Sequence, residues 1–287
     1  MTSGYISQAN PVPLVSVIIP TFNRSEYINR AVTSVLDQNF KDLELLVIDD
    51  GSTDETGRII ESLGDPRIRY FFQPNQGVSR ARNLGINNSR GRFISFLDSD
   101  DEWLPRKLEQ QLESLESHPE YRIVHTNEIW IRKGLRVNQK KIHRKYGGWI
   151  FHHCLPLCVI SPSSIMLNRD IFDKTSLFRE DFPVCEDYEL WLRLASAWPI
   201  LFIDDPLIVK YGGHHGQLSA RHWGMDRFRV KALSEIIESG NLTPMQKRQA
   251  VQELKRKCVI LEKGFRKRGK NAEADYFLAE AGQKYML

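Results

Sequence analysis

Three carboxylates stand together directly after an apolar segment of the chain. The segment Phe93–Leu97 is typical of a buried strand, and Asp98, Ser99, Asp100 and Asp101 follow it. So much negative charge at the tip of a buried strand is costly unless a cation or hydrogen-bond donors meet it. Carboxylate oxygens suit Mg²⁺ or Mn²⁺, which proteins often hold between one or two carboxylates and the phosphates of a substrate. These residues therefore predict a divalent metal beside a nucleotide diphosphate.

Two earlier segments of the chain end in a similar way. Residues 15–19 and 43–48 are short apolar runs that favour buried parallel strands. Turn or polar residues close the two runs: Pro20, Thr21 and Phe22 after the first, and Asp49 and Asp50 after the second. In open α/β sheets, ligands bind beyond the carboxyl ends of the strands. We therefore expect the three strand ends to face a common crevice.

Helical spacing between these runs completes an α/β pattern. Apolar residues recur at helical intervals within 25–38, and further helices are expected at about 54–63 and 78–88, with a strand at 68–72 between them. The pattern predicts an α/β sheet of Rossmann-like type. No glycine-rich turn follows the first run, which argues against a dinucleotide enzyme or a P-loop phosphotransferase.

The second half of the chain is expected to add strands and a helical appendage. Strand-like segments occur at 123–125, 128–131 and 163–167. A helix at 185–197 would open at Glu186 and Asp187, and Thr243-Pro244 and Ala272 would begin two more helices. Asp101 is expected to cap a helix at 103–115, and residues 134–150 to form a loop or lid on the acceptor side.

Composition sets broad limits on the class of protein. Of the 287 residues 41% are hydrophobic and 26% are charged, and no run of apolar residues is long enough to span a bilayer. The N-terminus is polar and lacks the features of a secretory signal, so the cytoplasm is the expected compartment. The four cysteines do not have the spacing of a disulfide scaffold, which favours reduced thiols.

The formal net charge is only +4, but much of the basic excess is concentrated late in the chain. A solvated helix face is the favoured interpretation of this segment. The alternative is peripheral binding of the basic C-terminal helices to anionic lipid at the inner membrane face, or to a polyanionic acceptor. No nucleic-acid-binding motif accompanies the charge, so we expect no nucleic acid partner.

Five motifs together resemble those of the family 2 glycosyltransferases, whose fold is called GT-A. They are residues 17–23, 47–54 and 77–83, the Asp98-x-Asp100 element and the pair Glu186-Asp187. The resemblance covers roughly residues 14–220. It implies a mixed α/β sheet of the GT-A type flanked by helices, and it divides the chain into an N-terminal extension (1–13), a GT-A domain (14–224) and a C-terminal helical segment (225–287).

The resemblance also implies a role for each matching residue on the donor side. Asp50 would accept a hydrogen bond from a uracil or thymine ring, which Pro20, Thr21 and Phe22 would flank. The ribose and diphosphate would lie near Arg80, Arg82 and Asn83, of which at least one should be solvated. Asp100 would bind the metal, Asp98 and Ser99 would lie at the ribose or a metal-bound water, and His214 or His215 would add a metal or phosphate contact.

On the acceptor side, the resemblance makes Asp187 the general base and Glu186 its supporting neighbour. Attack opposite the departing diphosphate inverts the anomeric carbon, so no second carboxylate nucleophile is required. The Gln-x-x-Arg-Trp element of processive polysaccharide synthases is absent from the sequence, which favours an enzyme that transfers one sugar. Plain N-capping of the helix is the alternative role of the pair.

The resulting expectation is a metal-dependent, inverting transfer from a nucleotide sugar, with UDP the favoured nucleotide. The acceptor would be a glycan, a lipid-linked sugar or a protein, in cell-surface polysaccharide or glycoconjugate synthesis. The alternatives are a sugar nucleotidyltransferase, an aspartyl-phosphate phosphatase and a non-catalytic nucleotide- or glycan-binding module. The first lacks its glycine-rich loop and the second lacks its later motifs. The sugar, the linkage and the oligomeric state do not follow from the sequence.

Overall fold

A computed structural model describes residues 12–214 and 223–282, so residues 1–11 of the predicted N-terminal extension and His215 lie outside the described residues. The described residues form a mixed nine-stranded sheet in the order β3-β2-β1-β4-β8-β6-β9-β5, with β7 paired to β6. The strands are β1 (Val15–Thr21), β2 (Leu43–Asp49), β3 (Ile68–Phe72), β4 (Phe93–Phe96), β5 (Glu102–Trp103), β6 (Ile123–Arg132), β7 (Leu135–Val137), β8 (Met166–Asn168) and β9 (Leu201–Gly212).

The first four strands are parallel, and the remainder of the sheet mixes directions. β1 lies between β2 and β4, and β3 continues beyond β2. β8 is antiparallel to both β4 and β6, whereas β6 is parallel to β9. The carboxyl ends of β1, β2 and β4 therefore lie along one edge, as the sequence predicts. The mixed α/β sheet expected from the sequence is confirmed.

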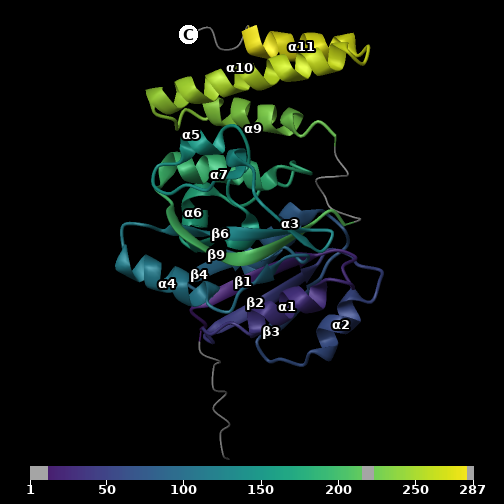
Figure 1. Ribbon diagram of the computed structural model, residues 1–287, viewed down its shortest axis with the longest axis vertical. Coiled ribbons are helices and arrows are strands. Elements are labelled where there is room, and N and C mark those ends of the chain that lie inside the picture. The colour runs from purple at the N-terminus through teal and green to yellow at the C-terminus, as the bar shows by residue number, and fades with distance from the viewer. Residues whose placement is uncertain (1–11, 215–222, 283–287) are drawn as a thin grey trace, which may run out of the picture.

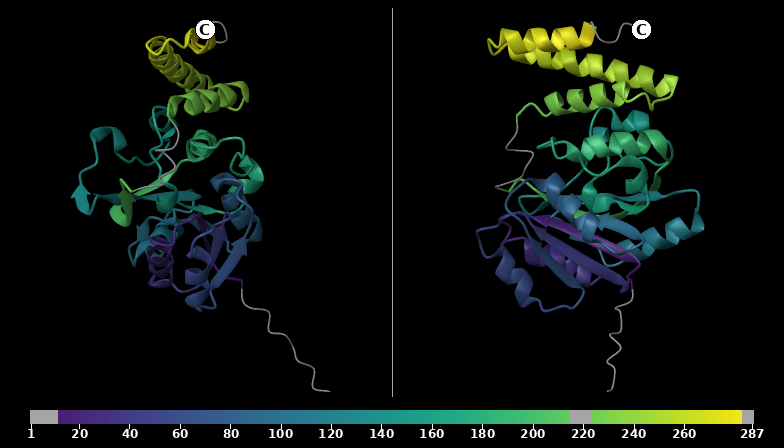
Figure 2. Two further views of the ribbon diagram at one scale, coloured as in Figure 1. Left: turned by 90° about the vertical axis from the view of Figure 1, so that its right-hand side faces the viewer. Right: turned by 180° about the vertical axis from the view of Figure 1, so that it is seen from behind.

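Helices cover both faces of the sheet (Figures 1 and 2). One face carries α1 (Ile28–Leu36), α2 (Thr56–Ser62) and α4 (Lys107–Ser117), and the other carries α3 (Val78–Asn88), α5 (Phe151–Cys154), α6 (Ile171–Thr175) and α7 (Glu186–Ala197). Short 3₁₀ turns at Lys141–His143 and Pro162–Ser164 interrupt the loops.

Strand alternation explains how one sheet supports two cores. Successive side chains of a strand point to opposite faces. In β1, Val17 and Ile19 accordingly join the cluster under α1, α2 and α4, and Ile18 joins the cluster under α3 and α7. β2 divides its side chains in the same way, so both strands are buried on both faces, as their continuous apolar sequences require.

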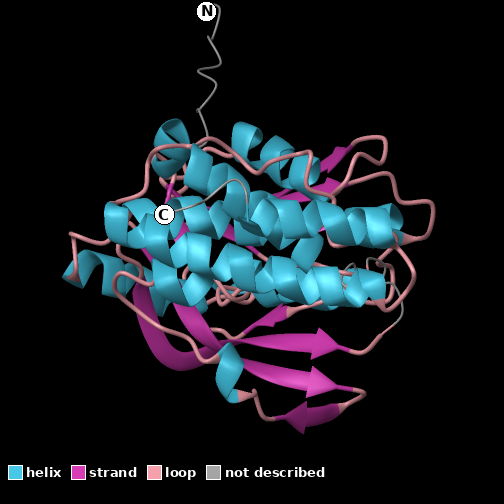
Figure 3. Cartoon of the chain, turned by 90° about the horizontal axis from the view of Figure 1, so that it is seen from above, coloured by secondary structure: helices cyan, strands magenta, loops and turns pink. Residues whose placement is uncertain are grey.

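Three helices stack beyond α5 and α7 (Figure 1): α9 (Asp226–Glu238), α10 (Pro244–Arg266) and α11 (Asn271–Gly282). α10 starts where the sequence predicts, because Thr243 and Gln246 form a reciprocal capping box. Seen from above, α10 and α11 run side by side across the helical layer (Figure 3). The helix α9 was not predicted from the sequence. The domain boundary near residue 225 stays a prediction.

These helices share the main hydrophobic cluster rather than a separate core. Leu254 and Cys258 of α10 are fully buried in the same cluster as Trp191 of α7. The buried Lys257 ammonium adds a polar tie, because its Nζ donates to the Pro156 carbonyl at 2.8 Å and lies 3.0 Å from Asp226 Oδ1. The four cysteines are free thiols. Within the described residues, no helix combines the length and apolar character needed to cross a bilayer.

Two local predictions are wrong. The helix expected at 103–115 begins only at Lys107, and Glu102–Trp103 instead forms β5 against β9. Asp101 is consequently not a helix cap. Residues 134–150 are not wholly loop, since β7 forms a hairpin with the end of β6.

Candidate active site

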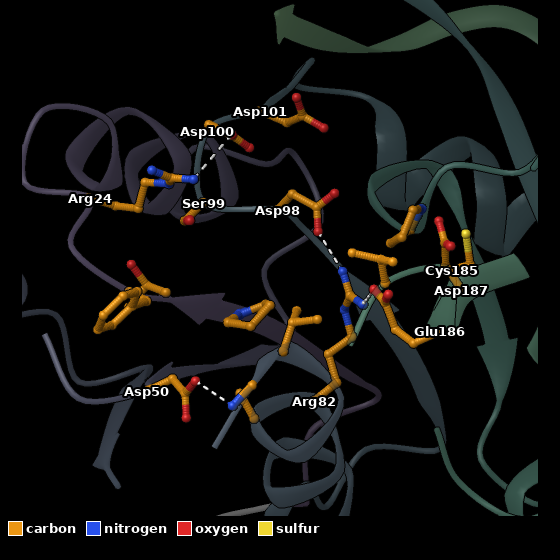
Figure 4. Close-up of a pocket in the computed structure, with 18 of the residues that line it drawn as sticks. Arg24, Asp50, Arg82, Asp98, Ser99, Asp100, Asp101, Cys185, Glu186 and Asp187 are labelled. Carbon is orange, nitrogen blue, oxygen red and sulfur yellow. Dashed lines mark hydrogen bonds and ion pairs between the residues drawn. The ribbon is translucent and has the colours of Figure 1, made fainter. Parts of the chain in front are cut away.

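A cavity of about 410 Å³ opens at the carboxyl ends of β1, β2 and β4 and reaches the start of α7 (Figure 4). Most of the residues that the sequence singled out line it: Pro20, Thr21, Phe22, Asp50, Arg82, Asp98, Ser99, Asp100, Glu186 and Asp187. The strand ends and the helices supply these residues, because the carboxyl ends of neighbouring parallel strands meet at one edge of the sheet. The common crevice expected from the sequence is therefore present.

Asp50 lies at one end of the cavity, where the loop before α3 holds its carboxylate. Oδ1 accepts hydrogen bonds from Gln73 Nε2 at 2.6 Å and from the Gln76 amide at 2.9 Å. Oδ2 accepts one from the Gly77 amide at 2.8 Å. Gly77 has φ +93°, a conformation that few other residues adopt. Since a carboxylate has about four acceptor positions, these bonds leave about one for a ligand.

Arg82 joins the two sides of the cavity (Figure 4). Its Nη1 donates to Glu186 Oε1 at 2.6 Å and its Nη2 to Asp98 Oδ1 at 2.8 Å, and its side chain is only 4% exposed. Asp98 and Glu186 outweigh the burial that disfavours the charge, so the pKa of Arg82 is raised. Arg82 lines the cavity, and carboxylates engage both ends of its guanidinium fork, so its place at the ribose and diphosphate stays a prediction.

Glu186 is buried beside a second carboxylate. Burial, together with the charge of Asp187, raises the pKa of Glu186 to about 7, although Arg82 opposes the rise. The predicted helix begins at Glu186, as expected, and Cys185 precedes it in the left-handed region with φ +62°. A non-glycine residue in that region is unusual, and it turns the chain so that Glu186 and Asp187 enter the cavity.

Asp187 has a thiol as a neighbour. Its Oδ2 accepts a hydrogen bond from Cys158 Sγ at 3.2 Å, and its Oδ1 accepts one from the Tyr188 amide at 2.7 Å. Burial and the charge of Asp187 raise the pKa of Cys158, which keeps the thiol protonated. Cys158 belongs to no motif that would predict this contact.

Asp100 is a candidate metal ligand with a histidine beside it. Its Oδ2 lies 2.9 Å from His214 Nε2 and 4.0 Å from Arg24 Nη2. Burial and the charge of Asp98 raise the pKa of Asp100, and Arg24 and His214 only oppose the rise. Carboxylate oxygens and an imidazole nitrogen are donors that Mn²⁺ or Mg²⁺ accepts, although the described residues hold no cluster of three acidic, histidine or cysteine side chains that would bind an ion by itself.

Asp101 is a buried carboxylate at the cavity wall, and the charge of Lys210 on β9 acts on it. Asp101 is 2% exposed, and its carboxylate accepts hydrogen bonds from Ser163 Oγ at 2.6 Å and from the Tyr211 amide at 3.3 Å. Burial raises the pKa of Asp101 to about 8. Lys210 lines the cavity, and the charge of Asp101 raises its pKa against burial. Lys210 was missed because it lies within the strand β9, where nothing marks it.

Two residues that were predicted to lie at the sugar donor, Arg80 and Asn83, do not line the cavity. The Arg80 side chain is 53% exposed and lies 3.7 Å from Glu180, so it is the solvated member of its group. Asn83 is buried and exchanges two hydrogen bonds with the backbone of Phe178, at 2.9 and 3.0 Å. Asn83 therefore holds the segment before α7, and contact between these two residues and a nucleotide is not supported.

Comparison with known proteins identifies relatives of the chain. The family described as "Glycosyl transferase family 2" matches residues 16–175. The Escherichia coli protein named "UDP-Glc:alpha-D-GlcNAc-diphosphoundecaprenol beta-1,3-glucosyltransferase WfaP" is 33% identical over 214 residues, which cover 72% of this chain and 80% of that protein. The chain spans about a third, 31 to 32%, of the length of the first curated relatives that it matches.

Solved structures share the fold at low sequence identity. TarS 1–349 from S. aureus, in complex with UDP-GlcNAc, has a TM-score of 0.71 at 19% identity and covers 93% of this chain and 81% of its own. A mannosyltransferase from Pyrobaculum calidifontis, in complex with GDP-Man and Mn²⁺, has a TM-score of 0.67 at 17% identity and covers 96% of this chain and 76% of its own. The architecture is therefore that of known glycosyltransferases.

Proposed function

Because the chain belongs to glycosyl transferase family 2, we propose that it moves a sugar from a UDP-sugar to a hydroxyl group of a glycan, lipid-linked sugar or protein acceptor. Residues 14–224 would form the transferase domain. The observation that carries the proposal is the cavity at the strand ends, in which Asp50 lies at one end, Asp187 at the other and Asp98 and Asp100 between them. The relative WfaP, whose name includes a UDP-sugar and a lipid-linked sugar, supports this choice of substrates.

The donor would lie across the strand ends. Asp50 has about one acceptor position left, which suits the imide N–H of uracil, and Pro20, Thr21 and Phe22 line the adjoining wall. The diphosphate would then reach Ser99 and Asp100. The carboxylates of Asp98 and Asp100 would repel a diphosphate unless a cation lay between them and the phosphates, which is a physical reason to expect a metal here.

Asp100, with Asp98 and His214 beside it, would hold Mn²⁺ or Mg²⁺. The ion would supply Lewis-acid stabilisation of the negative charge that grows on the departing diphosphate. Arg82 holds Asp98 in place through its 2.8 Å contact and balances the charge of Glu186. The arrangement thereby reduces the repulsion between the acceptor side and the donor.

Asp187 would accept the proton of the attacking hydroxyl group. It lies at the end of the cavity remote from Asp50, and its immediate neighbour Glu186 is neutralised by Arg82 (Figure 4). The Cys158 thiol donates a hydrogen bond to Oδ2 of Asp187. This bond partly occupies that oxygen and fixes the orientation of the Asp187 carboxylate. One base is sufficient for direct displacement with inversion, so no covalent intermediate is needed.

We also propose that the outer face of α10 rests on the anionic, cytoplasmic face of a membrane. Arg248, Lys255, Lys263 and Lys267 lie toward this face and make no salt bridge with any described residue of the chain. Val259 and Ile260 are 43% and 47% exposed on the same helix. Cations around exposed aliphatic side chains are typical of surfaces that bind acidic lipid.

Donor binding tests the proposed site directly. Thermal unfolding would be followed with UDP and with GDP, each with and without Mn²⁺, on the unaltered chain and on Asp100→Ala. We expect UDP with Mn²⁺ to stabilise the unaltered chain most, by about 2.7 kcal/mol at a hundredfold excess over Kd. Asp100→Ala should lose the metal-dependent part, whereas the exposed control Asp205→Ala should keep it. Metal-independent, undiminished UDP binding in Asp100→Ala would sink the assigned role.

A further inference from the structure

A second hollow, of about 440 Å³, lies where the segment before α9 meets α10 and α11. Its walls combine four aromatic rings with two cations, namely Trp223, Phe265, Tyr276, Phe277, Arg227 and Lys270. None of these residues belongs to the active-site cavity or to the family motifs. The hollow therefore needs an explanation of its own.

The aromatic rings are packed at their base and open at their rim. Phe265 stacks on Phe277 with centroids 5.5 Å apart, and Trp223 meets Phe265 edge-on at 5.5 Å. Both phenylalanines are buried, but Trp223 is 49% and Tyr276 58% exposed. Large aromatic surfaces left open around a hollow are typical of a binding surface for an apolar or amphipathic group.

Three cations surround the exposed indole ring. The side chains of Arg227, Lys270 and Arg268 lie 4.5, 5.4 and 5.7 Å from the centre of the Trp223 ring. One acid opposes them, since Glu273 lies 3.9 Å from Lys270, with both side chains about half exposed. The surroundings are thus net positive, which favours an anionic group beside the rings.

The hollow and the active-site cavity have lining residues that are close together in the chain. Met225 lines that cavity and Trp223 lines the hollow, and two residues of chain span at most about 7 Å. The Met225 carbonyl also accepts a hydrogen bond from Cys185 Sγ at 3.8 Å, directly before Glu186 and Asp187. A ligand could therefore occupy the hollow and extend toward the proposed base.

We infer that the hollow is an acceptor subsite that binds the diphosphate and the first apolar units of a lipid-linked acceptor. The inference rests on the proposed transferase function and names its acceptor class. Arg227 and Lys270 would meet the diphosphate, and Trp223 and Tyr276 would cover the apolar chain. The neighbouring basic face of α10 is where a lipid would enter from a membrane.

Calorimetric titration with farnesyl diphosphate, a short probe of this class, tests the inference. The full chain would first be saturated with UDP and Mn²⁺, so that the active-site cavity cannot take up the probe's diphosphate. Farnesol and inorganic pyrophosphate are the two partial probes. We expect farnesyl diphosphate to bind more tightly than either one, because it alone engages both the rings and the cations.

Trp223→Ala and Lys270→Glu should each weaken binding of farnesyl diphosphate by about tenfold, which corresponds to about 1.4 kcal/mol. Lys247→Glu makes the same charge change at the far end of α10 and should leave it unchanged. UDP affinity should be unaltered in all three variants.

No binding of farnesyl diphosphate, or equal binding by all variants, overturns the subsite. If pyrophosphate binds as tightly as farnesyl diphosphate, the assignment of the hollow to a lipid is overturned. Failure of UDP to bind the unaltered chain would instead count against the proposed function itself.

Discussion

Replacing Arg82 with methionine would test the bridge between the two sides of the cavity. Methionine keeps much of the side-chain volume but removes the charge and both donors. Glu186 would then keep a buried carboxylate without a cation, whereas Asp98, at 29% exposure, could turn toward water. Arg80→Met on the same helix is the matched control, because the Arg80 side chain is 53% exposed.

The expected loss follows from the burial of the ions. Removal of one partner from a buried ion pair costs about 3 to 5 kcal/mol, and an exposed pair is worth about 1 kcal/mol or less. At roughly 2 to 4 °C per kcal/mol, Arg82→Met should lower the midpoint of thermal unfolding by about 6 to 20 °C. The control should lower it by a few degrees at most.

The pH dependence separates charge from packing. In the native chain the pKa of Glu186 is raised from 4.5 to about 7, and loss of Arg82 removes an effect that lowers it. The folded state then binds a proton more readily than the unfolded chain, so stability rises as the pH falls from about 7 toward 4.5. The deficit of Arg82→Met should therefore be larger at pH 8 than at pH 5.

Differential scanning fluorimetry at both pH values, confirmed by urea unfolding, would measure these differences. Glu186→Gln in the Arg82→Met background should restore part of the lost stability, because it removes the unpaired charge. A midpoint within 2 °C of the Arg80→Met control at pH 8 would refute the claim that Arg82 is a buried bridge. A pH-independent deficit would attribute the loss to packing instead.

Three further outcomes are expected. Asp187→Asn should keep UDP affinity but lower the rate of sugar transfer by a factor of roughly a hundred or more; near-normal turnover would remove Asp187 as the base. Glu44→Gln should destabilise the fold by about 1.5 to 3 kcal/mol at pH 7, because the carboxylate accepts hydrogen bonds from Ser16, Arg69 and Arg90. These partners lower the pKa of Glu44 despite burial, so urea titrations should show the difference shrinking as the pH falls below about 4.5, and a constant difference would contradict this reasoning. Replacement of Arg248, Lys255, Lys263 and Lys267 with glutamate should abolish sedimentation of the protein with anionic vesicles at low salt. Unchanged sedimentation would exclude this face as the surface that contacts the membrane.

The sequence predicted the sheet edge well because its signals are local. Apolar runs that end at Pro20, Asp49 and Asp98 report buried parallel strands and their carboxyl ends without reference to the rest of the chain. The helix start at Thr243 was equally readable, since a capping box depends on residues three apart. Such features depend only on residues that are close together in the sequence.

The pairing of charges could not be predicted in the same way. Arg82 and Glu186 are 104 residues apart in sequence, and their contact depends on how α3 and α7 pack. Asp101 precedes an apparent helix signal, but its carboxylate is buried because β5 joins the sheet beside β9. Lys210 and Cys158 belong to no recognisable motif, so only the tertiary structure identifies them as neighbours of the cavity.

Helix α3 also sets a distance. Gly77 at its start is bonded to Asp50, and Arg82, five positions later, is bonded to Asp98 and Glu186. At about 1.5 Å per residue, the two attachment points are separated by about 7.5 Å along a rigid rod. The helix thus fixes the distance between the proposed nucleobase pocket and the proposed acceptor pocket. One residue inserted between the two points would turn Arg82 by about 100° about the helix axis and separate it from Asp98 and Glu186, although every motif would still be present in the sequence.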